Sequence, residues 1–389
     1  MSDGQKLLLI LILLYGFDCL VWIGRRTVLF SSAWMNRRRA GFAADFFGNS
    51  SGSVAILNPL PFLEPNYLAH WPPVSISPEG VCSLAVEAFP GGDAGGAAET
   101  LGFEAIAKSG TDGKRLLLNG ARFAMCGSEE EARAIAGLVR RLGAAPKHER
   151  ENIIRAELAA QFNRTRAVRM LRIITPRANA LRRAGTALFA FLYVAAPVAS
   201  YFYGVANLVI PAGIVMFLAA WSIGACYYRA DRALHPARVS DRIANLVNMC
   251  ICAPAAIRAA DFLTLRSMNR FHPVLLADLL LGEDGLAFAQ IVVRNLKYPG
   301  RRDTCDPVAA AIVRWQRDLQ LEACAEFVEK RHQISVEELL VQPQWDGGSA
   351  AYCPRCLAQY PAAGECMDCP GTELIPFKTA QETEAIHES

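Results

Sequence analysis

Four of the twelve cysteines stand in two CxxC pairs near the C-terminus. Cys353 and Cys356 form the first pair, and Cys366 and Cys369 form the second after nine intervening residues. Two thiolates three positions apart can bind one metal ion from a tight turn, and a second such pair completes a tetrahedral site. Because four cysteines leave no coordination position open, the spacing predicts one structural zinc ion rather than a catalytic metal.

The segment 351–377 resembles the small zinc ribbons found at the ends of many bacterial proteins, with Tyr352 and Tyr360 around the first cysteine turn. It departs from that pattern where Leu357 and Pro370 occupy positions at which glycine often follows the second cysteine. A module this short has almost no core, so we expect the metal to hold it, with roughly 10–16 kcal/mol of binding free energy. A redox dithiol pair and a rubredoxin-type iron site stay open as alternatives.

Other signals of chemistry are weak. The sequence has no HExxH, no phosphate-binding GxxxxGK[ST] and no GxGxxG. One GxSxG occurs at 48–52, but a nucleophile elbow needs a strand before it and a helix after it, and this stretch leads into a proline-rich segment. We therefore predict a loop there, and Cys250 and Cys252 are interpreted as structural. The sequence favours a non-enzymatic protein, although an active site without a local motif stays possible.

Apolar residues make up 52% of the chain and charged residues 20%, and the apolar excess is concentrated in two stretches. Residues 7–23 form an apolar run, and 45 residues between Arg183 and Arg229 contain no charge. Because one crossing takes about 20 residues, the second stretch predicts a two-helix hairpin at 185–228 with its turn at 203–207. Together with an N-terminal anchor at 1–24, the sequence predicts a mixed membrane protein with three transmembrane helices.

Asp18 lies within the first apolar run and opposes insertion by about 2.5–3.5 kcal/mol at worst. Twelve Leu, Ile, Val or Phe residues in the run outweigh it. A cleaved signal peptide is the alternative, but Arg25 and Arg26 interrupt the approach to the small residues at 31–33. An intramembrane carboxylate indicates a partner or a proton path. Contact with interfacial water or an arginine is the simpler interpretation.

The flanking arginines predict the orientation. Arg25, Arg26 and Arg37 follow the first run, and arginines also flank both ends of the hairpin, so these ends are expected in the cytoplasm. The N-terminus would then lie outside, and the soluble regions 24–184 and 229–389 would share the cytoplasmic side of a bacterial inner membrane. That compartment is reducing, as zinc thiolates require.

Residues 40–147 predict a small α+β domain. Asp112–Gly113 and Asn119–Gly120 are two-residue hairpin signals that divide 101–126 into three strands. Ser128, followed by three glutamates, caps a helix to about Leu142. The buried face of that helix is predicted to comprise Ile135, Ala136, Leu138, Val139 and Leu142. The order of a meander and a helix resembles pleckstrin-homology-like domains.

Residues 148–183 predict one basic amphipathic helix that leads into the hairpin, with a kink at Pro176. Between Gln161 and Arg183 it carries seven arginines and no acidic residue, namely Arg164, Arg166, Arg169, Arg172, Arg177, Arg182 and Arg183. Such a helix can bind anionic lipid headgroups, or it can be the ordinary basic flank of a membrane span. With a net charge of only +3 and a membrane surface beside these arginines, no nucleic acid is expected.

Residues 229–345 predict a helical cytoplasmic region. Helices are expected over 238–257, 261–270, 273–282, 283–296 and 306–331, with a short helix capped by Ser335. The apolar run 274–281 is predicted to be core. Gly348–Ser349 is interpreted as a linker to the ribbon at 351–377, and 378–389 as a disordered tail.

These features favour a membrane-anchored, cytoplasm-facing adaptor or assembly protein whose ribbon docks protein partners. Two alternatives stay open: a subunit of a membrane enzyme or transport complex, and a sensor that responds to anionic lipid through the basic helix.

Overall fold

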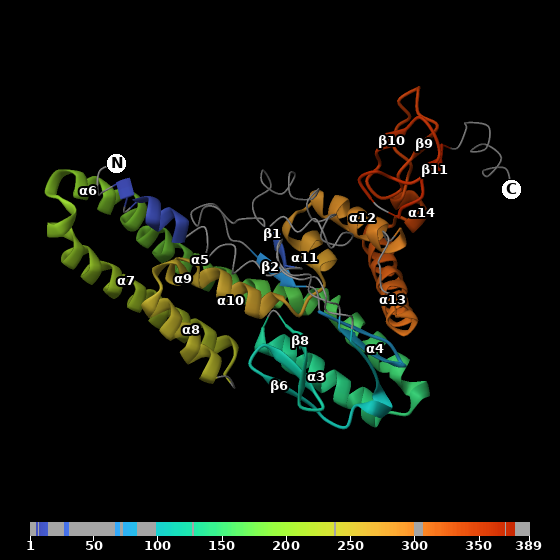
Figure 1. Ribbon diagram of the computed structural model, residues 1–389, viewed down its shortest axis with the longest axis horizontal. Helices are drawn as coiled ribbons and strands as arrows, with labels where there is room; N and C mark the ends of the chain where they lie inside the picture. The colour runs from blue at the N-terminus through green and yellow to red at the C-terminus, as the bar shows by residue number, and fades with distance from the viewer. Residues whose placement is uncertain are drawn as a thin grey trace.

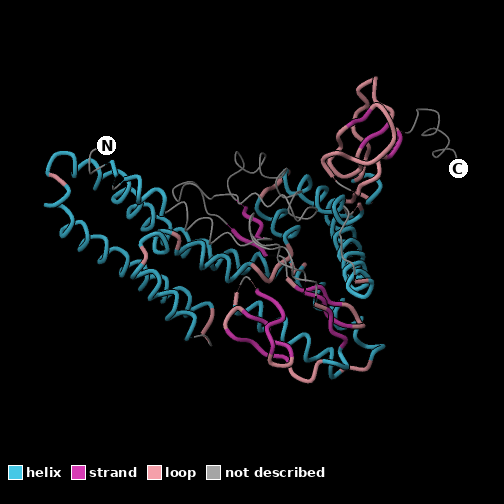
Figure 2. Tube along the Cα trace, in the orientation of Figure 1, coloured by secondary structure: helices cyan, strands magenta, loops and turns pink. Residues whose placement is uncertain are grey.

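The computed structural model describes residues 5–6, 8–14, 27–30, 67–70, 73–83, 99–126, 128–236, 239–298, 306–369 and 371–377. Over these ranges the protein is a mixed α/β structure, mostly helical with small antiparallel sheets (Figures 1 and 2). Asp18, the GxSxG stretch at 48–52 and the tail at 378–389 lie outside the described residues.

Two described segments are helices long and apolar enough to cross a membrane. The first combines α5 (Arg164–Ala190), a π-helical turn (Phe191–Ala195) and α6 (Ala196–Tyr203), and the second is α7 (Val205–Leu234). Between them Gly204 has a φ of 78°, a conformation that glycine adopts without a Cβ clash. The hairpin therefore turns within the predicted window at 203–207.

Three spanning helices were predicted, and this number is corrected to two helices of sufficient length and apolar character within the described chain. Of the first apolar run, residues 8–14 are helical, and this piece is too short to cross a bilayer. The piece lies beside the hairpin, where the Tyr193 hydroxyl donates a 3.1 Å hydrogen bond to the Leu11 carbonyl (Figure 1).

The basic segment forms two helices rather than the single helix predicted for 148–183. Helix α4 (Lys147–Gln161) ends before α5 begins, because Asn163 caps α5 by accepting a hydrogen bond from the Arg166 amide at 2.9 Å. Helix α5 then continues through Pro176, and its α-helical pattern changes only at the π-helical turn.

Two three-stranded antiparallel sheets form the β part of the small domain. The first contains β3 (Val74–Ile76), β4 (Gly80–Ser83) and β5 (Thr100–Gly102), and the second contains β6 (Ser109–Asp112), β7 (Arg115–Leu118) and β8 (Ala121–Met125). The second sheet turns at Gly113 and at Asn119–Gly120, all with positive φ, as the hairpin signals predict. The predicted strand over 101–109 is instead divided by a 3-10 turn at Phe103–Ala105, so its ends join different sheets.

Helix α3 (Glu129–Ala144) closes this small domain. The Ser128 side chain caps it by accepting a hydrogen bond from the Glu131 amide, and all five residues of the predicted face are buried. Ile154 and Leu158 of α4 and Leu319 of α13 (Pro307–His332) complete the same core. Helix α4 therefore packs with the α+β domain, whereas the sequence grouped it with the basic helix.

A second core joins the hairpin to the remaining helices, which are α8 (Val239–Ile251), α9 (Ala253–Ile257), α10 (Ala259–Met268), α11 (Pro273–Leu280), α12 (Asp284–Lys297), α13 and α14 (Val336–Leu339). The single helix expected over 238–257 is broken at Cys252. Residues 274–277 are fully buried, which confirms the predicted core. An antiparallel pair of strands, β1 (Thr27–Phe30) and β2 (Tyr67–His70), packs on this body through Tyr67, whose hydroxyl lies 2.8 Å from the Thr175 hydroxyl.

Candidate metal centre

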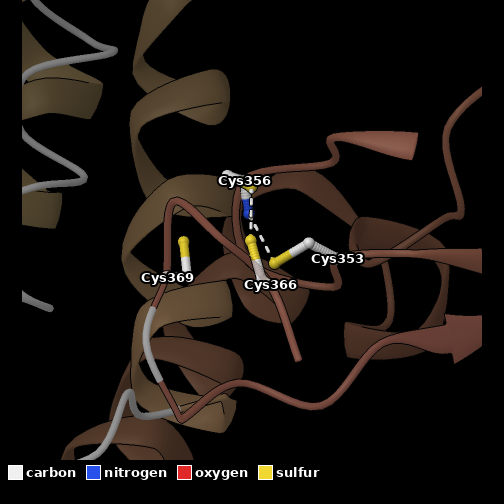
Figure 3. Close-up of side chains that lie close together, drawn as sticks. All are labelled: Cys353, Cys356, Cys366 and Cys369. Carbon is white, nitrogen blue, oxygen red and sulfur yellow. Dashed lines mark hydrogen bonds between the residues drawn. The ribbon is translucent and has the colours of Figure 1, made fainter. Parts of the chain in front are cut away.

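The four predicted cysteines converge at one site. Their sulfur atoms all lie within 4.8 Å of one another (Figure 3). A tetrahedral site with metal–sulfur bonds of about 2.3 Å places its sulfurs roughly 3.8 Å apart. The Cys356 and Cys366 sulfurs are 3.6 Å apart, so the thiols fit one metal ion without large movement.

The first cysteine pair occupies a tight turn after β9 (Ala351–Tyr352). This strand pairs with β10 (Gln359–Tyr360) and β11 (Ile375–Pro376) to form a three-stranded sheet. Within the turn the Leu357 amide donates a 2.9 Å hydrogen bond to the Cys353 carbonyl, and the Cys356 amide donates to the Cys353 sulfur at 3.5 Å. The bond to sulfur favours the thiolate form of Cys353.

Each cysteine turn contains a left-handed residue. In the first turn it is Leu357, with a φ of 64°. In the second turn it is Gly371, with a φ of 74°, and the Thr372 amide closes the turn on the Cys369 carbonyl at 3.0 Å. Both turns therefore reach ligand geometry despite the departures noted in the sequence, and the first does so with a leucine in an unfavourable conformation.

Hydrogen bonds among the four thiols make their pKa values unequal. Hydrogen bonds from Cys356 and Cys369 lower the pKa of Cys353 far below its usual value. The same contact with Cys353 raises the pKa of Cys369. Without a metal, Cys353 is therefore the first thiol to ionise, and a bound metal ion would have to displace the protons of the others.

An outer partner also orients the second pair. The Tyr360 hydroxyl lies 3.2 Å from the Cys366 sulfur. Residues outside the ligand set fix ligand orientation and tune metal affinity. Tyr360 stands in the sequence where the ribbon resemblance places an aromatic residue, but only the structure assigns its hydroxyl to Cys366.

The ribbon is docked on the helical body. Arg355, within the first CxxC pair, is 9% exposed, and its Nε donates a 2.7 Å hydrogen bond to Oδ1 of Asn295 on α12. A charged hydrogen bond in a buried contact is worth about 1.5–3 kcal/mol. The ribbon is thereby fixed in orientation relative to α12.

The predicted Gly348–Ser349 linker is also held in place. The amides of Gly348 and Ser349 donate hydrogen bonds of 3.0 and 2.8 Å to one carboxylate oxygen of Asp346. The Gln359 side chain spans from the Asp346 amide to the Gln344 carbonyl, at 3.0 and 2.8 Å. The connection to the ribbon is therefore an ordered loop, because Asp346 forms the turn that its side chain favours.

The seven arginines of the predicted lipid site do not share one environment. Arg182 is buried against Asp261 at 3.8 Å, and Arg164 pairs with Asp278 at 3.6 Å. Arg177 is half-buried and donates to the Ile173 carbonyl. The exposed members are Arg164, Arg166, Arg169, Arg172 and Arg183.

The contact between buried Cys324 and His272 was not predicted from the sequence. The Cys324 sulfur lies 3.9 Å from Nε2 of His272, and Phe162 stacks on the imidazole at 4.3 Å. Burial lowers the pKa of His272 to about 3 and raises the pKa of Cys324. Both groups are therefore neutral, which is the reverse of an activated thiolate–imidazolium pair. In the sequence, Pro273 indicates the start of α11 and therefore a capping role for His272, but nothing there indicates a contact with Cys324.

The described surface also contains a pocket of about 920 Å³ between the small domain and the start of α13. Trp315, Ile312 and Pro78 form apolar walls, and Lys147 and Glu151 stand among the lining residues. This pocket shares no residue with the cysteine site.

Comparisons of the chain with protein-family models, with curated proteins and with solved structures find no match. The features of the described chain that bear on function are the four-cysteine site, its docking contacts and the two apolar helices.

Proposed function

We propose that this chain is a membrane-anchored assembly protein that holds a zinc ribbon in a fixed orientation as a docking site for a protein partner. The observation that carries the proposal is the convergence of four thiols in a ribbon fastened to α12 by Arg355. A closed four-thiolate site supports structure rather than catalysis.

The hairpin supports the membrane anchor. Tyr201, Phe202 and Tyr203 at its tip are 83%, 72% and 67% exposed, as aromatic residues at a headgroup layer are. Arg229 and Arg232 are exposed near the other end of α7, which favours the cytoplasmic side for that end. The N-terminal helical residues 8–14 lie along the half of the hairpin that contains the tip, consistent with an external N-terminus.

The ribbon and its ordered loop present apolar side chains to solvent. Met367, between the second pair of cysteines, is 86% exposed, and Trp345 in the loop is 58% exposed. Aromatic residues and methionine are enriched at protein interfaces. Because Arg355 and Asp346 fix the ribbon and loop, these side chains are presented in one orientation, which lowers the entropy cost of binding a partner.

The metal is tested on the full chain purified from membranes in reducing buffer without chelators. We expect about one zinc ion per chain, and Cys353→Ser should remove it because three thiolates no longer close the site. Cys226→Ser, an exposed cysteine of α7, is the matched control and should retain the metal. Full zinc in Cys353→Ser, or iron in place of zinc, would contradict the assignment.

Docking is tested by placing a photo-crosslinking benzoylphenylalanine at Met367 in native membranes. We expect one defined polypeptide adduct that disappears when Cys353→Ser is introduced as well. The same probe at Val308, which is 56% exposed on α13, is the control. An adduct that survives loss of the metal, or one formed equally from Val308, would exclude the ribbon as the docking site.

A second candidate function, response to anionic lipid, is favoured by one face of α5. Arg166, Arg169 and Arg172 are exposed at three-residue spacing, and in the described part of the chain no carboxylate lies within ion-pair distance of them. The continuous helix limits this function, because at 1.5 Å per residue Arg166 lies roughly 27 Å along the axis from residue 184, where the uncharged stretch begins. A strongly tilted hairpin would be required to bring Arg166 to the headgroups.

The lipid function is tested with the full chain in nanodiscs. Replacing these three arginines by glutamine should abolish any stabilisation of the fold by phosphatidylglycerol over phosphatidylcholine if the face binds lipid. An unchanged preference would exclude this face as the lipid site.

A further inference from the structure

Helix α8 exposes an apolar stripe. Val239, Ile243, Val247 and Ile251 recur every four residues, a spacing that places them on one face of a helix. They are 55%, 47%, 48% and 80% exposed. A helix on the surface of a soluble domain turns such a face toward the core.

The opposite face of α8 is held against α7. Arg242 donates to Asp231 at 2.9 Å, and the Asn245 side chain donates to the Tyr227 hydroxyl at 3.0 Å. A Cβ added at Gly224 would lie 2.7 Å from the Leu246 side chain. Residue numbers rise on α8 as they fall on α7, so α8 runs back along α7 toward the hairpin tip (Figure 1).

The segment that follows has no charge. From Ile243 to Ile257 no Asp, Glu, Lys or Arg occurs. Helix α9 then packs against α5 so closely that a Cβ added at Gly185 would lie 2.4 Å from the Ile257 carbonyl oxygen. Helix α9 thus contacts both helices of the hairpin, α5 and α7, and the chain then continues into α10.

Its depth follows from the positions of the two glycines. Gly185 and Gly224 lie 19 and 20 residues from Gly204 (204 − 185 and 224 − 204). At 1.5 Å per residue this is about 30 Å, the thickness of the hydrocarbon core of a bilayer. With the tip at one interface, both glycines mark the other interface. Continuing the α8–α7 pairing places Ile251 near Ala220, inside that layer.

The charges at both ends of the segment are placed as this depth requires. Arg242 precedes the segment and is buried against Asp231. Arg258 follows it and lies 3.3 Å from Asp261. Pairing reduces the cost of charge near hydrocarbon. On α7, Leu218 and Trp221 are 57% and 53% exposed near the end of α8, so the apolar surface of α7 continues into the stripe.

We propose that residues 243–257 form a re-entrant membrane segment: α8 enters the cytoplasmic edge of the bilayer, Val247 and Ile251 at the end of its stripe contact lipid acyl chains, and α9 returns the chain to the same side. Backbone that turns at membrane depth is tolerated where protein covers it, and α5 and α7 flank α9. This inference rests on the hairpin crossing the bilayer, and it moves the segment out of the soluble region expected from the sequence.

The test introduces benzoylphenylalanine at Val247 or Ile251 of the full chain in native membranes and identifies the adducts by mass. Leu218 on α7 reports the hairpin itself. Val341, which is 58% exposed in the loop before the ribbon, is the matched control outside the bilayer. We expect phospholipid adducts at Val247, Ile251 and Leu218, and none at Val341.

The outcomes separate the two proposals. Lipid adducts at Leu218 with none at Val247 and Ile251 would overturn the re-entrant segment and leave the anchor intact. A polypeptide adduct at Ile251, to a second copy or to another protein, would overturn lipid as the occupant of the stripe. Absence of lipid adducts at Leu218 would overturn the crossing hairpin and the re-entrant segment together.

Discussion

Arg266 of α10 lies between two buried carboxylates, Asp231 at the end of α7 and Glu130 in the first turn of α3. Its Nη1 is 3.0 Å from Oδ2 of Asp231, and its Nε donates to Glu130. Arg242 of α8 bonds the same Asp231 oxygen at 2.9 Å. One guanidinium therefore joins the small α+β domain to the hairpin.

Replacing Arg266 by methionine should destabilise the protein by about 3–5 kcal/mol, because it removes the cation that two buried carboxylates share. Denaturant unfolding of the purified chain in detergent micelles measures this. Arg232→Met, at an exposed position on the same end of α7, should change stability by less than about 0.5 kcal/mol. Equal effects of the two substitutions would show that the ion pairs of Arg266 do not contribute to the free energy of unfolding.

Arg355→Ala should release the ribbon from α12 while leaving its metal bound, because Arg355 lies between two ligands without being one. Loss of a buried charged hydrogen bond is expected to cost about 1.5–3 kcal/mol. Hydrogen exchange of α12 and of the loop at 341–350 should become faster, with unchanged zinc content. Loss of zinc with unchanged hydrogen exchange would indicate that Arg355 stabilises the first cysteine turn and does not hold the ribbon on α12.

The left-handed residues of the two cysteine turns predict opposite effects on metal affinity. Leu357→Gly should relieve a strain of about 1 kcal/mol and tighten metal binding up to about fivefold. Gly371→Ala should introduce the same strain and weaken binding by a similar factor. Competition with a chelator of known affinity measures both. Weaker binding by Leu357→Gly would mean that the packing of this half-buried leucine outweighs its strain.

His272 predicts an acid-sensitive stability. Burial lowers its pKa to about 3, below its ordinary value of 6.5, so the unfolded chain binds more protons between these pH values. The stability due to the neutral imidazole is complete above pH 6.5 and is lost as the pH falls toward 3. Between pH 7 and 5 the loss should be about 2 kcal/mol.

His272→Asn keeps an acceptor that can cap α11 and removes the titration, so its loss between pH 7 and 5 should be about 2 kcal/mol smaller than that of the parent. His148→Asn, at an exposed position, is the control. Unfolding free energies at the two pH values provide the comparison. Identical slopes for the parent and His272→Asn would place the acid sensitivity elsewhere.

Several local features could be predicted from the sequence because they depend on residues within one or two turns of each other. Ser128 and Ser335 cap α3 and α14, and Asp306 accepts the Val308 amide at the start of α13. Gly204 lies in the predicted turn window and breaks the hairpin. The CxxC spacing placed the metal ligands for the same reason, since each pair needs only its own tight turn.

Environments set by distant partners could not be predicted. Arg182 and Arg183 are adjacent, yet one is buried against Asp261 and the other is exposed, because the packing of α10 on α5 covers only one side of the helix. The contact of Arg355 with Asn295 joins residues 60 positions apart. From the sequence, α8 was expected to belong to a soluble region. In the structure it lies antiparallel to α7, and this position leaves its apolar stripe exposed.

By itself, then, the sequence determined the ligand set, the capped starts of α3, α13 and α14 and the hairpin turn, because backbone hydrogen bonds and caps are satisfied by near neighbours. Only the tertiary structure decided which arginines face inward, where the ribbon rests and which apolar face stays uncovered. Those outcomes depend on how elements far apart in the chain cross and pack, and the pattern within a single element contains no information about its neighbour.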